Sequence, residues 1–125
     1  ERSHPQRSSS AMTMSRRVFL MHALDCIDFV AEQLKSLEKH DFLENRIVRD
    51  ALLRNLEIIG QSFKDYGIEL LESTHPAIRW RQIAGFRNQL AHEYLGLDHE
   101  LIWGILNQHL RPLRHALSEH LETLP

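Results

Sequence analysis

Cysteine, glycine and long apolar runs are scarce in this chain of 125 residues, and each shortage excludes a class of protein. The single cysteine, Cys26, cannot form an internal disulfide, which is typical of proteins kept in a reducing cytosol. Because Leu24 and Ile27 flank it, its side chain is expected to be a small buried apolar group rather than a nucleophile. No apolar run approaches the roughly 18 residues that a membrane-spanning helix needs, so we expect a cytoplasmic protein with no membrane partner.

Several kinds of chemical site are missing as well. The chain contains neither a glycine-rich phosphate loop nor a serine nucleophile motif. Its formal net charge of -2 is no global signal for nucleic acid, so a site for a polyanion must be a local patch. Nine histidines invite a metal hypothesis, but a bundle di-metal site needs Glu-x-x-His pairs inside long helices. That spacing occurs only at Glu1–His4 and Glu72–His75, outside the predicted long helices, so we expect no metal and no cofactor.

Strand patterns are absent too, whereas helical periodicity runs through most of the chain. An apolar stripe over residues 16–39 predicts a first amphipathic helix. After a short break at His40-Asp41, a wider stripe over residues 42–65 predicts a second helix with contacts on two sides. The expected fold is all-α, an antiparallel bundle of four or five helices.

Glycine and capping residues divide the second half of the chain. Gly67 should end the second helix, and a turn should follow. Ser73 or Thr74 can then cap a short helix over residues 77–84, and Gly85 should bend or break the chain after it.

The last two helices follow that bend. A helix over residues 87–94 should end at Gly96, and Asp98 can cap a long final helix that Pro112 should kink. At the other end of the chain, residues 1–13 have no periodicity and are interpreted as a leader-like or tag-like flexible tail. Residues 14–125 are then expected to form one domain.

The stretch from Arg87 to Tyr94 is the best candidate for function. It brings a permanent cation, an imidazole and a phenol together within eight residues. On a helix, Arg87 and His92 are five residues apart, so their directions diverge by roughly 140° at about 100° per residue. They could act on one ligand only through the length of the arginine, or if a second copy of the chain completes the site. The alternative is an ordinary amphipathic segment with solvated polar residues.

Metal-free cleavage of RNA suits these residue types. RNA supplies its own nucleophile, the 2′-hydroxyl, so the protein needs only a base with a pKa near neutrality and a cation for the phosphate. His92 fits the first role and Arg87 the second. Between residues 76 and 94 the charges are Arg79, Arg81, Arg87 and Glu93, a sum of 3 − 1 = +2, which is a modest basic patch.

Arg87-x4-His92-x-Tyr94 resembles the R-x4-H-x-Y signature of the HEPN superfamily, in its HepT toxin branch. The flanking segments extend the resemblance over nearly all of the chain after residue 13. These segments are Arg49-Asp50-Ala51, Arg54 to Gly60, Pro76 to Trp80, Gly85 to Asn88, Leu97-Asp98 and Ile102-Trp103. Gln61-Ser62 departs from the Glu-Ala that the family is expected to carry, which removes any acidic role at position 61.

The resemblance implies a five-helix bundle that forms a two-fold homodimer. It implies a metal-independent endoribonuclease toxin with Arg87 and His92 as catalytic residues and Asn88 as a supporting residue, acting on an RNA substrate at the dimer cleft. It also implies an antitoxin partner, a minimal nucleotidyltransferase, that silences the toxin by transferring AMP to Tyr94. The alternative is a helical subunit that docks a nucleotidyltransferase or a nucleotide without cleaving anything.

Overall fold

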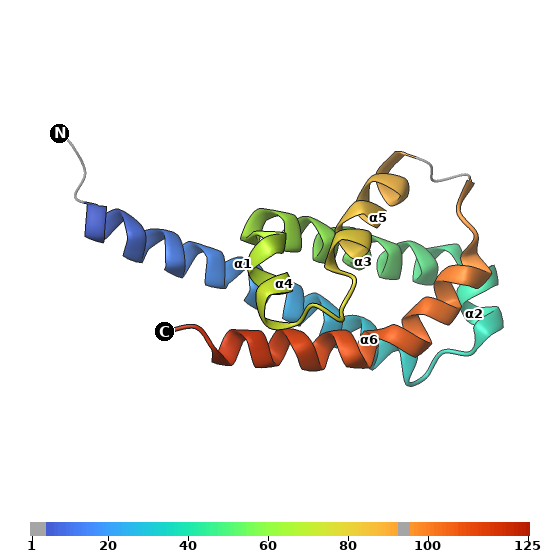
Figure 1. Ribbon diagram of the computed structural model, residues 1–125. Helices are drawn as coiled ribbons and strands as arrows, with labels where there is room; N and C mark the ends of the chain where they lie inside the picture. Colours follow the sequence, from blue (N-terminus) through green and yellow to red (C-terminus); the bar gives the residue numbers. More distant parts are fainter. Residues whose placement is uncertain (1–4, 93–95) are drawn as a thin grey trace.

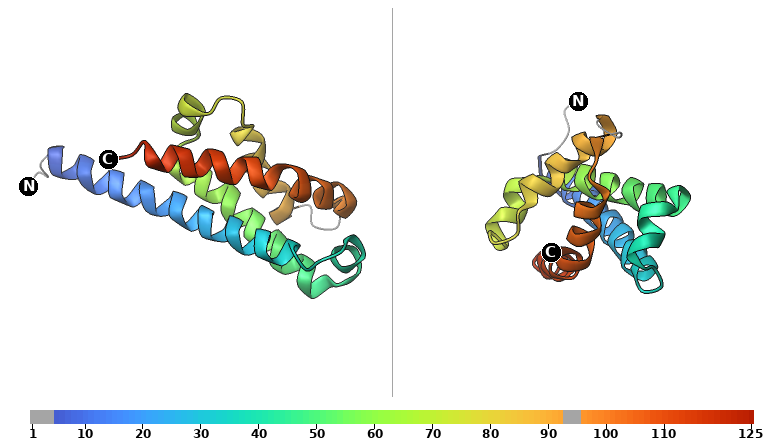
Figure 2. Two further views of the ribbon diagram at one scale, coloured as in Figure 1. Left: turned by 90° about the horizontal axis from the view of Figure 1, so that it is seen from below. Right: turned by 90° about the vertical axis from the view of Figure 1, so that its right-hand side faces the viewer.

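The computed structural model describes residues 5–92 and 96–125, with side chains from residue 16 to 90 and from 96 onward. Its described residues are helical and contain no strand, which confirms the all-α expectation. The six helices in this part of the chain are α1 (Pro5–Leu34), α2 (Lys39–Glu44), α3 (Arg46–Tyr66), α4 (Ile68–Thr74), α5 (Trp80–His92) and α6 (His99–Glu122). Figure 1 shows the chain order, and Figure 2 shows α1 and α6 side by side along the long axis.

The first helix is longer at one end and shorter at the other than the periodicity predicts. α1 already includes residues 5–13, which were interpreted as a tail, and it ends at Leu34. Whether the domain begins at residue 14 stays a prediction.

The predicted break at His40-Asp41 is wrong, because both residues belong to α2. The backbone N–H of Glu38 donates to Asp41 Oδ2 at 2.9 Å, a local hydrogen bond that starts this short helix. Asn45 then caps α3, since its side-chain oxygen accepts from the backbone N–H groups of Ile47 and Val48.

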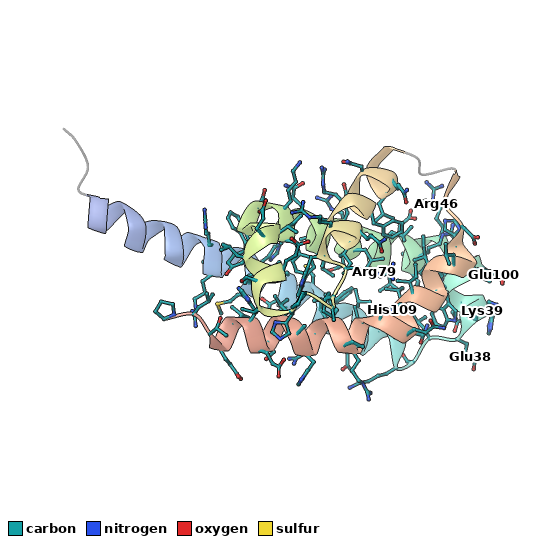
Figure 3. The ribbon with its side chains drawn as sticks, viewed as in Figure 1. Glu38, Lys39, Arg46, Arg79, Glu100 and His109 are labelled. Carbon is teal, nitrogen blue, oxygen red and sulfur yellow. The ribbon has the colours of Figure 1, made fainter. Side chains whose placement is uncertain are left out.

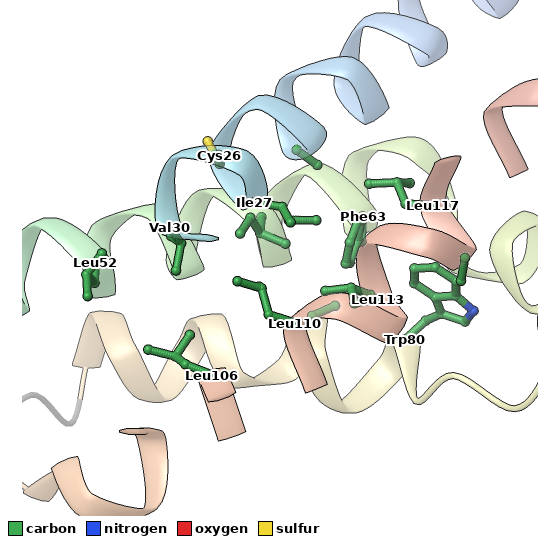
Figure 4. Packing of buried hydrophobic residues seen from close by; sticks show 14 of the residues in the cluster. Cys26, Ile27, Val30, Leu52, Phe63, Trp80, Leu106, Leu110, Leu113 and Leu117 are labelled. Carbon is green, nitrogen blue, oxygen red and sulfur yellow. The ribbon is translucent and has the colours of Figure 1, made fainter. Parts of the chain in front are cut away.

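α3 is the central helix and packs against both α1 and α5, as its wide apolar stripe predicts. Cys26 is buried at 6% exposure among apolar side chains, as expected for a structural cysteine, and burial raises the pKa of its thiol. Figure 4 shows part of the core, in which most labelled side chains come from α1, α3 and α6, and Trp80 comes from α5. It includes Ile27 and Val30 from α1, Leu52 and Phe63 from α3, and Leu110, Leu113 and Leu117 from α6.

Gly67 ends α3 as predicted, with a φ of 123° that favours glycine. The following segment is a helix, α4, and not a turn. The predicted capping role of Ser73 and Thr74 is wrong because these residues end α4, where the Ser73 hydroxyl donates to the carbonyl oxygen of Leu70. The next helix, α5, therefore does not start from a cap at either residue.

α5 is one continuous helix from Trp80 to His92, so the predicted short helix over residues 77–84 and the break at Gly85 are both wrong. Tertiary packing explains the difference. The fully buried Trp80 ring stands edge-on to Phe63 with centroids 5.2 Å apart, and Trp80 Nε1 donates to the carbonyl oxygen of His75 at 2.9 Å. This anchor fixes the start of α5, and packing outweighs the roughly 1 kcal/mol that glycine costs inside a helix.

The last helix begins and bends as the sequence predicts. The Asp98 side chain caps α6 by accepting from the backbone N–H of Leu101 at 3.1 Å. α6 continues through Pro112 to Glu122, and its ribbon changes direction between its orange and red parts (Figure 1). How the chain passes from His92 to Gly96 lies outside the described residues.

A chain of hydrogen bonds joins α3, α4 and α6 at the end of the molecule far from the C-terminus of α5. Tyr66 Oη lies 2.6 Å from His120 Nε2, and His120 Nδ1 lies 2.7 Å from Thr74 Oγ1. The same hydroxyl is 2.9 Å from His75 Nδ1, and His75 Nε2 is 2.8 Å from Glu119 Oε1. His120 is 3% exposed, and its burial lowers the pKa of the imidazole, with the nearby charge of His75 as a second cause.

Candidate functional site

The continuous α5 helix carries Arg87 and Asn88 on one turn and His92 on the next. Asn88 is exposed and Arg87 is half-buried. The backbone of His92 ends the described part of this helix, and its side chain lies outside the described residues. Tyr94 lies outside them entirely, so its position relative to Arg87 stays a prediction.

The stem of Arg87 faces α3. A Cβ atom built on Gly60 of α3 would be only 3.2 Å from Arg87 Cβ, so the two helices are very close at this point. Arg87 Nε is buried and has no hydrogen-bond partner among the described residues. A buried nitrogen without a partner is uncommon in proteins, and a role in binding or catalysis is one explanation of it.

Two more such nitrogens, Arg49 Nε and His99 Nε2, lie where α2, α3 and α6 meet. Arg49 holds α2 in place, since its NH1 donates to the carbonyl oxygens of Leu43 at 2.7 Å and Phe42 at 3.3 Å. Burial lowers the pKa of His99, and the charge of Arg49 lowers it further. His99 therefore favours its neutral form.

A small apolar pocket of about 80 Å³ opens beside the site helix. Its walls come from three helices, with Leu56 and Ile59 on α3, Ile83 and Phe86 on α5, and Ile105, Leu106, His109, Leu110 and Leu113 on α6. His109, labelled in Figure 3, is exposed and is the only residue of this lining with an ionisable side chain. Such a pocket suits apolar contact better than binding of a charged ligand.

Ion pairs make the predicted basic patch smaller than its formal charge. The Arg81 guanidinium donates from Nε and NH2 to the two carboxylate oxygens of Glu72, at 3.1 and 3.3 Å, and its NH2 also lies 3.7 Å from Glu69. Because Arg81 is paired in this way, it adds little to a phosphate site. Arg79 is exposed (Figure 3).

The other chemical classes give no positive signal within the described ranges. No group of three histidine, cysteine or acidic side chains in residues 16–90 and 96–125 is arranged to hold a metal ion. None of the helices in the described part of the chain is long and apolar enough to cross a membrane.

The sequence model of the "Ribonuclease HepT-like" family matches residues 23–120, which contain the core and the whole of α5. The chain belongs to this family. The match confirms the resemblance to the HEPN superfamily and its HepT branch.

Curated relatives agree with the family match. A candidate RNase of Caldanaerobacter subterraneus subsp. tengcongensis is 33% identical over 106 residues, covering 85% of this chain and 94% of the relative. A candidate RNase of Methanocaldococcus jannaschii is 32% identical over 84% of this chain and 98% of its own length. The probable ribonuclease HepT of Thermococcus cleftensis is 29% identical over 82% and 93%. No solved structure matches the chain.

Sequence reasoning about the site misses two residues that lie against α5. Gly60 interrupts a strong helical pattern without ending it, which is a recognisable signal for a close packing contact. His109 is one of several histidines on the last helix, and nothing in the spacing distinguishes it from its neighbours. Its place at the pocket depends on how α6 packs against α3 and α5.

Proposed function

We propose that the chain is a metal-independent endoribonuclease toxin whose catalytic residues are Arg87 and His92, supported by Asn88. Ribonuclease function at the coarser level follows from membership of the HepT-like family. The observation that carries the finer proposal is the unbroken course of α5 through positions 87, 88 and 92 in a chain of that family.

The proposed chemistry uses the RNA as its own nucleophile. His92 takes the proton of a 2′-hydroxyl, the 2′-oxygen forms a bond to the adjacent phosphorus, and the bond from phosphorus to the 5′-oxygen breaks. That oxygen leaves with a proton from a protonated imidazole or from water. Arg87 binds the phosphate oxygens while their charge grows. The products are a 2′,3′-cyclic phosphate and a 5′-hydroxyl end.

An oligoribonucleotide assay in excess chelator tests this chemistry. We expect cleavage that yields cyclic phosphate ends, and no cleavage where a single 2′-deoxynucleotide replaces the residue before the scissile phosphate. Cleavage that needs a divalent ion, or that continues at the deoxy position, would contradict the mechanism. A folded protein that binds RNA or nucleotide without cutting it would favour the non-catalytic docking subunit.

A two-fold homodimer is part of the proposal, because directions five residues apart on α5 diverge by roughly 140°. A second copy can complete each site. Two apolar side chains of α6 are exposed, Leu101 at 61% and Ile105 at 38%. Ile105 also lines the apolar pocket, and this exposed apolar surface of α6 supports contact with the second copy.

Sedimentation of two charged variants tests the dimer. Ile105→Glu should weaken self-association, whereas Val18→Glu, at a 61% exposed position on α1, should leave it unchanged. A wild-type chain that stays monomeric at tens of micromolar would remove the shared-site proposal.

Silencing by an antitoxin is proposed at Tyr94. The chain has two tyrosines, and Tyr66 is 3% exposed with its hydroxyl bonded to His120, so it is a poor acceptor for any transferred group. AMP on Tyr94 would add phosphate charge and bulk close to His92 in the sequence, where Arg87 could pair with it instead of with RNA.

Mass measurement after incubation with a minimal nucleotidyltransferase and ATP tests the silencing. We expect one adenylyl group on peptides containing Tyr94, none on Tyr94→Phe, and unchanged transfer to Tyr66→Phe. Equal silencing of the Tyr94→Phe protein would overturn the regulatory proposal and leave the ribonuclease proposal standing.

A further inference from the structure

Helices α3 and α5 lie very close to each other at Gly60. A Cβ atom at this position would lie 3.0 Å from the carbonyl oxygen of Ile83, 3.2 Å from Arg87 Cβ and 3.4 Å from Ala84 Cα. Two of these three atoms belong to the backbone of α5, and the third is the first side-chain atom of Arg87. None of them can move aside by a side-chain rotation alone, so any side chain at position 60 must shift α5.

Other helical glycines in the described part of the chain have no such restriction. Around Gly85 on α5 and Gly104 on α6, a Cβ atom would meet nothing within 4 Å. Gly60 is also buried, while Gly85 is exposed. A close helix crossing is therefore specific to position 60 among these three, and it explains a glycine inside a long helix.

The start of α5 is held independently of this crossing. Trp80 is fully buried, its ring packs edge-on against Phe63, and its Nε1 donates to the carbonyl oxygen of His75. With that end fixed, a methyl group at position 60 would tilt α5 more than it would translate it. The displacement would grow toward the C-terminal end of the helix, which carries positions 87 to 92.

We propose that Gly60 is a positioning residue for the ribonuclease reaction, acting by setting the depth of α5 and the direction of the Arg87 side chain. The inference rests on the proposed catalytic role of Arg87. A shift of about 1 Å in a group that must meet a phosphate can lower a rate by about 100-fold. At contacts of 3.0 to 3.4 Å the neighbouring atoms give by a few tenths of an ångström, so 100-fold is the upper limit of the expected loss. A structural glycine would affect stability alone, whereas a positioning glycine affects kcat in the folded protein.

The test compares three glycine-to-alanine variants in one RNA cleavage assay. Gly60→Ala should fold, by circular dichroism and sedimentation, and lose about 10- to 100-fold in kcat with a smaller change in KM. Gly85→Ala and Gly104→Ala should cleave at the wild-type rate, since their added methyl groups meet nothing. A folded Gly60→Ala protein with wild-type kcat would overturn the proposal.

A double-mutant cycle with Arg87→Ala separates positioning from general distortion. If Gly60 acts mainly through the guanidinium, adding Gly60→Ala to Arg87→Ala should lower kcat less than it does in the wild-type background, because only the displacement of the His92 end of α5 remains. An equal loss in both backgrounds would refute the positioning role. If Arg87→Ala by itself cleaves like the wild type, the proposed function fails first. If only Gly60→Ala does so, the catalytic proposal stands and the positioning proposal falls.

A second measurement covers the case in which Gly60→Ala does not fold. An excluded osmolyte such as sucrose favours the folded state, so the Gly60→Ala protein and the wild type would be compared in the same osmolyte buffer. The refolded Gly60→Ala protein should still lose kcat, because its methyl group at position 60 continues to meet Arg87 Cβ. Recovery of both fold and wild-type kcat would show that Gly60 serves packing alone.

Discussion

Two ends of this molecule differ in how their buried polar nitrogens are satisfied. At the junction of α3, α4 and α6, the buried His120 has a partner on each ring nitrogen, with Tyr66 on one side and Thr74 on the other. On α5, the buried Arg87 Nε has no hydrogen-bond partner among the described residues. The first arrangement is complete without a ligand. The second contains a polar group that substrate phosphate could satisfy.

The direction of the bonds explains how the junction holds together. The Glu119 carboxylate can only accept, so a His75 ring with a single proton donates to it from Nε2 and accepts from the Thr74 hydroxyl at Nδ1. Thr74 then accepts from His120 Nδ1, and His120 Nε2 accepts from the Tyr66 hydroxyl. With one proton on each ring, one direction of donation satisfies every group in this hydrogen-bond network. A polar network of that kind stabilises and specifies the fold.

The contrast indicates that a buried polar group with all its partners in place serves the fold, whereas one without a partner is available to a ligand. We therefore expect changes on α5 to alter cleavage and changes at the junction to alter stability. Single substitutions can separate an effect on cleavage from an effect on stability.

After the loss of His92 itself, Arg87→Ala should give the largest effect. Removing one charge-stabilising group typically lowers kcat by about 10²–10³-fold. The thermal midpoint should change little, since the guanidinium makes no hydrogen bond through its buried Nε with the described residues. RNA cleavage rates and calorimetry on the same preparation check both parts. A large fall in the midpoint with normal activity per folded molecule would place Arg87 with the structural residues instead.

His120→Ala should give the reverse result. It leaves the hydroxyl of the buried Tyr66 without its partner, and an unsatisfied buried group costs about 1–3 kcal/mol. Urea unfolding should show this loss, while cleavage per folded molecule stays at the wild-type value. A His120→Ala protein that is fully stable but inactive would contradict a structural role for His120.

Acid should weaken the junction in a predictable pH window. Burial lowers the pKa of folded His120, so below the ordinary histidine value of about 6.5 the unfolded chain binds more protons than the folded one. The free energy of unfolding should then fall as the pH falls from about 6.5. His99 has a lowered pKa with the same sign, so replacing His120 by Gln should reduce the slope without removing it. A slope unchanged in that variant would exclude His120 as a source.

His75→Ala should give the smallest effect. Its ion pair with Glu119 joins side chains that are 21% and 50% exposed, so solvent screens the interaction. Pairs of this kind contribute roughly 0–1 kcal/mol. Urea unfolding should therefore place His75→Ala clearly above His120→Ala in stability. A larger loss of stability for His75→Ala than for His120→Ala would mean that the hydrogen-bond network depends on its exposed end.

Much of the fold follows from local pattern. The α3 stripe, the end of that helix at Gly67 and the start of α6 at Asp98 all depend on periodicity and capping, which act over a few residues. Trp80 and Gly85 show where local reasoning fails, since the packing of the buried indole against Phe63 sets the start of α5 and carries the helix through the glycine.

The site divides in the same way. Arg87 and His92 can be selected from their spacing and a family resemblance, and α5 supports that choice. The close contact of Arg87 with Gly60, and the pairing of Arg81 with Glu72, join residues that are far apart in sequence or lie on different helices. Both contacts depend on tertiary packing, which the spacing of residues in the sequence does not predict.

The central claim is that cleavage belongs to the α5 end of the molecule, and one assay with two matched histidine variants tests it most directly. Purified wild type, His92→Ala and His120→Ala would be incubated with the same RNA in excess chelator, at a temperature where circular dichroism shows all three folded. We predict that His120→Ala cleaves like the wild type and that His92→Ala is slower by about 10²–10⁴-fold, the usual contribution of a general base. Wild-type cleavage by His92→Ala would contradict the account, whatever the behaviour of His120→Ala.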